Sequence, residues 1–127
     1  MANSNTREVI LNPTAVRATT AGYTSYFKVS DIANWQLAVN NGCNQTVTLN
    51  IEYIGIDGTV TNFNSATVAG TTFDIVFPIN SNAASGVKPL FGATTPTGND
   101  GIRIRYSYSV APTSGNLFIE LHRLVKR

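Results

Sequence analysis

The chain has few residues of the kinds that carry chemistry. It contains one cysteine, Cys43, and one histidine, His122, among its 127 residues. A single cysteine cannot form an intramolecular disulfide, and without a second cysteine or a nearby histidine it has no partner for holding a metal ion. A single histidine excludes multi-histidine metal sites and leaves a serine or cysteine nucleophile with one possible base. We therefore expect Cys43 to be a buried or inert thiol in a turn.

Charged residues are also scarce. They make up 13% of the chain, about half of the usual share, and the net charge is +2. The basic residues are spread along the sequence, except for Arg123, Lys126 and Arg127 at its end. Nucleic-acid-binding proteins carry a basic patch or stripe, so this distribution argues against nucleic acid as a partner.

Targeting signals and long apolar runs are absent as well. No segment approaches the run of about 18 apolar residues that a membrane span needs. The first residues, MANSNTREVILNP, lack the charged start and apolar stretch of a secretory signal. We expect a protein that is made in a reducing cytoplasm and has no membrane partner.

The seven carboxylates and the known motifs indicate no catalytic site. Asp57 and Asp100 each precede a glycine, as is typical of turns, while Glu52 and Asp74 fall on the expected solvent faces of strands. No motif supports an acid and base pair of carboxylates. Neither a Gly-x-Ser-x-Gly elbow nor a phosphate-binding loop with its lysine occurs. The sequence predicts a protein that is not an enzyme and has no cofactor or metal ion.

What the chain has in abundance is the alternation of β-strands. Over 46–54, the apolar residues Val47, Leu49, Ile51 and Tyr53 alternate with polar ones, a two-residue period that a helix cannot satisfy. Comparable patterns predict further strands at 8–11, 15–19, 23–29, 35–39, 59–63, 71–79, 102–110 and 116–125. Eight or nine strands and no helix longer than one turn predict an all-β fold with two packed antiparallel sheets, a β-sandwich of the jelly-roll or immunoglobulin-like kind.

Several local expectations follow from this pattern. The bends at 12–13 and 32–34 are expected to be turns, and the last 26 residues are expected to form a β-hairpin through a turn at 111–115. Pairing of Val110 with Gly115 in this hairpin would place Arg105 opposite Glu120 on the outer face. It would likewise place Arg103 opposite His122.

Two segments lack the alternation. Residues 1–7 are polar and are predicted to be an N-terminal arm, outside a single β-sandwich domain that spans 8–127. Residues 80–101 are rich in glycine, proline and small polar residues and are predicted to be a long loop. Both are natural places for contacts that become ordered against a neighbouring subunit.

The aromatic residues divide into two groups by strand parity. Those in step with their apolar neighbours are expected in the core: Phe27, Trp35, Tyr53, Phe73, Phe77, Tyr106, Tyr108 and Phe118. Those that break the pattern or lie near loops are expected at an exposed contact surface: Tyr23, Tyr26, Phe63 and Phe91. The predicted partner contacts are completed by residues of the arm and the C-terminal tail: Asn3, Thr6, Arg7, Lys126 and Arg127.

Four short motifs carry a resemblance to a known group of proteins. They are VSDI at 29–32, WQLAVNN at 35–41, VTLNIE at 47–52 and DGT at 57–59. Together with the two C-terminal strands, this series is similar to small β-sandwich structural proteins of tailed bacteriophage virions. The likeness covers about 27–63 and 102–127.

The resemblance implies a structural role in a virion, as a capsid decoration or cement subunit or as a head-fibre or tail-associated subunit. Such proteins bind a capsid lattice or one another, so the implied partners are the major capsid protein, other virion subunits and further copies of this chain. A homotrimer would fit the three-fold positions of an icosahedral lattice. The alternative interpretation is a glycan-binding module or a tail-fibre adhesion protein, with exposed aromatic rings stacked on sugars.

Overall fold

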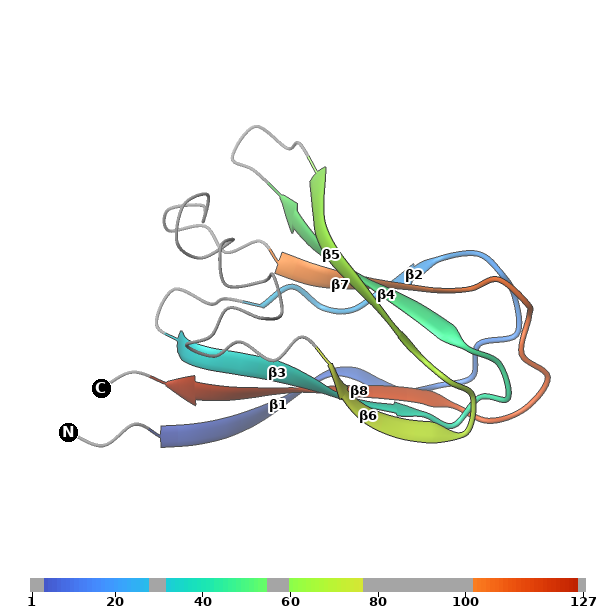
Figure 1. Ribbon diagram of the computed structural model, residues 1–127, viewed down its shortest axis with the longest axis horizontal. Helices are drawn as coiled ribbons and strands as arrows, with labels where there is room; N and C mark the ends of the chain where they lie inside the picture. The colour runs from blue at the N-terminus through green and yellow to red at the C-terminus, as the bar shows by residue number, and fades with distance from the viewer. Residues whose placement is uncertain (1–3, 28–31, 55–59, 77–101, 126–127) are drawn as a thin grey trace.

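The computed structural model describes residues 4–27, 32–54, 60–76 and 102–125. Within these ranges it describes only the backbone of 4–6, 32–35, 53–54, 60–64 and 123–125. The described residues form eight strands and no helix, arranged as two four-stranded antiparallel sheets (Figure 1). The predicted all-β sandwich is therefore confirmed.

The two sheets are named here by their strand order. Sheet A has the order β1-β8-β3-β6, and sheet B has the order β2-β7-β4-β5. The strands of sheet A are β1 (Ser4–Thr14), β8 (Leu117–Val125), β3 (Ile32–Asn41) and β6 (Thr72–Val76). The strands of sheet B are β2 (Gly22–Tyr23), β7 (Ile102–Tyr108), β4 (Val47–Ile54) and β5 (Val60–Val68).

Alternate side chains of the central strands fill the space between the sheets. In β7 the four residues at even positions are buried and the three between them are partly exposed. The same period operates in β8 and, apart from the additionally buried Ala38 and Glu52, in β3 and β4. It produces a core of fully buried side chains: Leu37, Val39, Val47, Leu49, Ile51, Ile102, Ile104, Leu117, Ile119 and Leu121. Each such side chain contributes about 1.5–3 kcal/mol when it is removed from water, so this core is the main source of stability.

The first strand is longer than predicted. Residues 4–7, expected to belong to an arm, are the start of β1, and the pairing with β8 begins at Ser4 and Val125. The strand also continues past Pro13, because register shifts after Val9 and after Leu11 leave the proline without a ladder hydrogen bond to donate. A polar segment can form a strand at this place because β1 is at the edge of sheet A.

Two other local expectations are wrong. The segment 15–19 is not a strand; Val16 is buried in it, and Arg17 Nη1 donates to the Gly115 carbonyl oxygen at 2.8 Å. The expected turn at 32–34 is instead the start of β3, which pairs with β8 from Ile32 onward.

The predicted C-terminal hairpin does not form. Strand β7 belongs to sheet B and β8 to sheet A, so 109–116 connects the two sheets. Arg103 lies opposite Glu52 of β4, and Arg105 lies opposite Asn50, while Glu120 is paired with Ala38 of β3. The loop residues 111–115 fit a turn, but they turn the chain between layers rather than back along one sheet.

Only some of the aromatic residues predicted to lie in the core are buried there. Phe27, Tyr106 and Tyr108 are buried as predicted. Phe73 is 59% exposed and Phe118 is half-buried, because both are paired with Asn40 on the outer face of sheet A and Val76 is the buried residue of β6. The side chains of Trp35 and Tyr53 are not described, and Phe77 lies outside the described residues, as does the predicted loop at 80–101.

A buried amide joins the sheets at the end of β3. Asn41 is fully buried, and its Nδ2 lies within hydrogen-bond distance of the carbonyl oxygens of Gln45 (2.9 Å), Val68 (3.0 Å) and Ala69 (3.1 Å). Its Oδ1 accepts a hydrogen bond from the Tyr108 hydroxyl at 2.8 Å. Asn41 belongs to sheet A and its partners Val68 and Tyr108 to sheet B, so one side chain connects both layers. Cys43 is a free, buried thiol close by, as predicted.

Two buried tyrosines should make stability depend on pH in alkaline solution. Burial raises the pKa of Tyr106 and of Tyr108, and a hydrogen bond with Cys43 acts in the same direction at Tyr108. Above pH about 10 the tyrosines of the unfolded chain lose their protons, while these two lose theirs less readily in the folded state. We therefore expect the free energy of unfolding to fall as pH rises, by up to about 1.4 kcal/mol per pH unit for each tyrosine.

Urea unfolding between pH 8 and 11 measures this effect. The fall should be shallower for Tyr106→Phe, which removes one of the two ionising groups. Parallel curves for the variant and the wild type would exclude Tyr106 as a source of the pH dependence.

Candidate functional site

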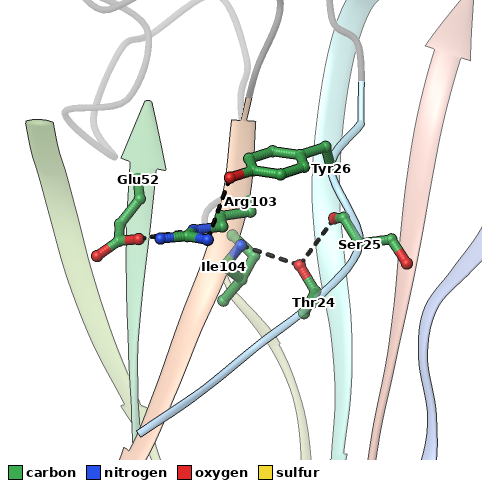
Figure 2. Close-up of polar contacts among 6 residues, drawn as sticks. All are labelled: Thr24, Ser25, Tyr26, Glu52, Arg103 and Ile104. Carbon is green, nitrogen blue, oxygen red and sulfur yellow. Dashed lines mark hydrogen bonds and ion pairs between the residues drawn. The ribbon is translucent and has the colours of Figure 1, made fainter. Parts of the chain in front are cut away.

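The predicted contact residues Tyr23 and Tyr26 lie at one edge of sheet B, where β2 ends. Thr24 N–H donates to the Ile104 carbonyl oxygen at 2.9 Å, and Phe27 N–H donates to that of Ile102 at 2.8 Å. The chain thus advances three residues along this edge while β7 advances two, which defines a β-bulge. At the bulge, the Thr24 hydroxyl accepts the Ile104 N–H at 3.0 Å in place of a backbone carbonyl (Figure 2).

The bulge decides which aromatic side chains face solvent. In a regular strand Tyr23 and Phe27 would share one face, and Tyr26 would lie on the opposite face. The extra residue reverses the parity, so that Phe27 is buried while Tyr26 is 50% exposed and Tyr23 is 45% exposed. Bulges re-aim side chains in this way beside many functional sites.

The same segment is also tied to the other sheet. Ser25 N–H donates to the carbonyl oxygen of Ile10 in β1 at 3.2 Å. Thr24 and Phe27 are bound to sheet B, so three backbone hydrogen bonds within four residues attach this segment to both layers. Tyr26 lies between these anchors and Tyr23 directly precedes them, paired with Arg105 in β2, so the backbone of both tyrosines is held in place.

Arg103 of β7 brings the two tyrosine rings into one site. Its guanidinium carbon lies 3.9 Å from the centroid of the Tyr23 ring and 5.4 Å from that of Tyr26. Its Nη1 donates to the Tyr26 hydroxyl at 3.1 Å, and its Nε donates to Glu52 Oε1 at 2.9 Å (Figure 2). We call this group of Tyr23, Tyr26, Arg103 and Glu52 the tyrosine platform.

The platform is electrically balanced and partly covered. The Arg103 and Glu52 side chains are 21% and 10% exposed, so the ion pair lies beneath the more exposed rings. Each cation–π contact contributes about 0.5–2 kcal/mol, depending on how far the cation is shielded from water. The Glu52 carboxylate neutralises the arginine, so the platform presents two oriented aromatic rings rather than a net charge.

The structure brings only some of the predicted contact residues together. It brings Tyr23 and Tyr26 together, while Arg7 is exposed on β1 of the other sheet. Thr6 and Phe63 lie in β1 and β5, at positions whose side chains are not described. The others lie outside the described residues: Asn3, Phe91, Lys126 and Arg127.

Arg103 and Glu52 were not predicted as site residues. Glu52 was expected on a solvent face, yet it is 8% exposed because Arg103 lies against it. Their parity, outward on two different strands, could be read from the sequence. The adjacency of β4 and β7 could not, because 47 residues separate the two strands along the chain, and the sequence pattern places the arginine in a hairpin instead.

Within the described part of the chain, no group of three or more His, Cys, Asp or Glu side chains is placed to hold a metal ion. His122 Nε2 lies 3.0 Å from Glu120 Oε1 on the same strand, and both are partly exposed. Asp74 is exposed on β6, while Asp57 and Asp100 lie outside the described residues. The described residues also include no helix that is long and apolar enough to span a membrane.

Comparison with known proteins gives a match of fold. No protein family and no curated protein matches the sequence. The fold has a solved counterpart. The crystal structure of the PBSX exported protein XepA matches 96% of this chain with a TM-score of 0.65 and 14% sequence identity, and the match covers 38% of that protein's chain. This chain thus spans less than half of the length of XepA, and at this identity the likeness shows the two-sheet fold.

Proposed function

We propose that the chain is a non-enzymatic structural protein of a phage virion, a capsid decoration or cement subunit that binds its partner through the tyrosine platform. The sequence resembles small virion β-sandwich proteins, and the fold is shared with the PBSX exported protein. The observation that carries the proposal is the pair of exposed tyrosine rings held around Arg103.

The platform has the properties of an interface anchor. Tyrosine and arginine are enriched among the residues that contribute most to protein–protein binding. Tyrosine side chains whose backbone and ring orientation are already fixed lose little conformational entropy on binding. Because Glu52 already pairs with Arg103, burying the platform against another protein surface would not leave the arginine without its counter-charge.

The proposed partner is the outer surface of a capsid lattice, and the proposed location is the virion. Copies of the chain would associate as a symmetric homo-oligomer, and a trimer would match the three-fold positions of such a lattice. Light scattering over a range of concentrations tests this part, since the mass of a single chain throughout would contradict self-association.

Co-sedimentation with purified phage particles from the strain that encodes the chain tests the binding role. We expect wild-type protein to sediment with the particles and the Tyr23→Ala/Tyr26→Ala double variant to remain in the supernatant, with affinity reduced at least tenfold. Phe73→Ala is the matched control, because it removes an exposed aromatic ring from the other sheet. Equal binding of the double variant, or no binding by the wild type, would contradict the proposal.

A glycan-binding role is the second candidate, and the same two rings favour it. Exposed tyrosines stack on the apolar faces of sugar rings, and the neighbouring Arg103 and Glu52 could bond to hydroxyl groups. Wild-type binding to a glycan array that disappears in the double variant, without sedimentation on particles, would favour this role over the first.

A further inference from the structure

The dipeptide Asn41-Gly42 is the one Asn-Gly pair in the chain. In an unfolded chain this pair is prone to spontaneous deamidation, because glycine offers no side chain to hinder the reaction. The Gly42 nitrogen attacks Cγ of Asn41, the new N–C bond closes a succinimide ring, and the side-chain amide leaves as ammonia. Water then opens the ring at either carbonyl, which produces aspartate or its β-linked isomer.

Both reacting groups are held in the folded protein. The Asn41 amide is fully buried, with its nitrogen near three backbone carbonyls and its oxygen bonded to the Tyr108 hydroxyl. The Gly42 N–H donates to the Asn116 carbonyl oxygen at 2.8 Å. Ring closure requires this nitrogen to lose its proton and to turn toward Asn41 Cγ, so the Gly42 hydrogen bond and the Asn41 hydrogen bonds must break together.

The products do not fit the same place. A carboxylate at position 41 would put an oxygen, in place of Nδ2, against the carbonyl oxygens of Gln45, Val68 and Ala69, which offer it no proton. Its charge would be buried without a cation among the hydrogen-bond partners of Asn41. The β-linked isomer adds a backbone atom beside Gly42, where even a Cβ would lie 2.8 Å from the Asn116 oxygen.

We propose that Asn41-Gly42 is a modification site that the fold protects and that reacts in the unfolded chain, after which the chain cannot regain the native structure. Folding therefore preserves the residue on which the fold depends. Unfolding that lasts long enough for the reaction becomes irreversible without aggregation or proteolysis.

Peptide mapping by mass spectrometry tests the protection. Wild-type protein is kept at one mildly alkaline pH and temperature, either folded or unfolded in urea, and the peptide that contains residues 41 and 42 is followed over time. We expect deamidation of Asn41 to be roughly a hundredfold slower in the folded sample, because such a buried site opens rarely in a protein of ordinary stability. Similar rates in the two samples would overturn the proposal.

Refolding after removal of urea tests the consequence. We expect the fraction that refolds to fall in step with the fraction deamidated at Asn41, and the refolded material to contain unmodified Asn41. Two matched variants distinguish the effect of an aspartate at position 41 from the effect of the same change at a neighbouring position. Asn41→Asp should fail to fold, while Asn40→Asp, the same change at the exposed neighbouring residue, should fold like the wild type. Recovery of deamidated chains in folded form, or native folding of Asn41→Asp, would overturn the proposal.

Discussion

Replacing Gly115 with alanine is expected to destabilise the protein by about 3 kcal/mol or more. Gly115 has a φ of +86°, a conformation that costs an L-residue about 1–2 kcal/mol. A Cβ at this position would lie 1.8 Å from the Gly42 carbonyl oxygen, so the two backbone segments would have to separate. Such overpacking costs about 1–3 kcal/mol more. Thermal unfolding should show a melting temperature lower by about 10 °C or more.

The neighbouring Ser114→Ala variant is the control for this prediction. Ser114 is exposed in the same loop, and its replacement should change stability by less than about 0.5 kcal/mol. If Gly115→Ala were within 1 kcal/mol of the wild type, the close approach of Gly115 and Gly42 would not be a constraint on the fold. The contact matters because it lies where the chain passes from sheet B to sheet A, beside the hydrogen bond from Gly42 N–H to Asn116.

That crossing explains why the sequence predicted the C-terminal strands but not their arrangement. The alternation in 102–108 and 117–125 depends on which side chains face the core, and it was sufficient to identify both strands. The crossing instead of a hairpin goes with the pairing of β8 with β1 and β3 and with the close approach of Gly115 to Gly42, all contacts between residues far apart in the sequence. A turn-forming composition such as that of 111–115 is compatible with both.

The sequence predicted only part of the candidate site, for a similar physical reason. The exposure of Tyr23 and Tyr26 was predictable because both break the apolar pattern around them. Their convergence on Arg103 depends on one extra residue in the bulge, which is stabilised by the Thr24 hydroxyl and by a hydrogen bond to β1. No local pattern marks that residue, since a regular strand over the same letters satisfies the same alternation. Long-range pairing of β7 with β4 then supplies Glu52.

The ion pair of the platform leads to the second large effect. Glu52→Ala is expected to destabilise the protein by about 2 kcal/mol, because it leaves the partly buried Arg103 guanidinium without its carboxylate. The Glu52→Ala/Arg103→Ala double variant should be less destabilised than the sum of the single variants, since the orphaned charge is removed along with its partner. Urea unfolding of the four proteins of this cycle gives the coupling energy.

The pair of His122 and Glu120 on β8 provides the matched control. Its side chains are 28% and 23% exposed, and its members lie on one strand, so Glu120→Ala should cost less than about 1 kcal/mol. Additive effects in the Glu52 and Arg103 cycle would mean that the pair contributes nothing beyond its separate side chains.

The Arg103→Ala variant also tests the proposed binding function, because it keeps both tyrosines but removes the group that orients them. If the platform binds through rings fixed in advance, this variant should fold and yet bind phage particles several-fold more weakly than the wild type.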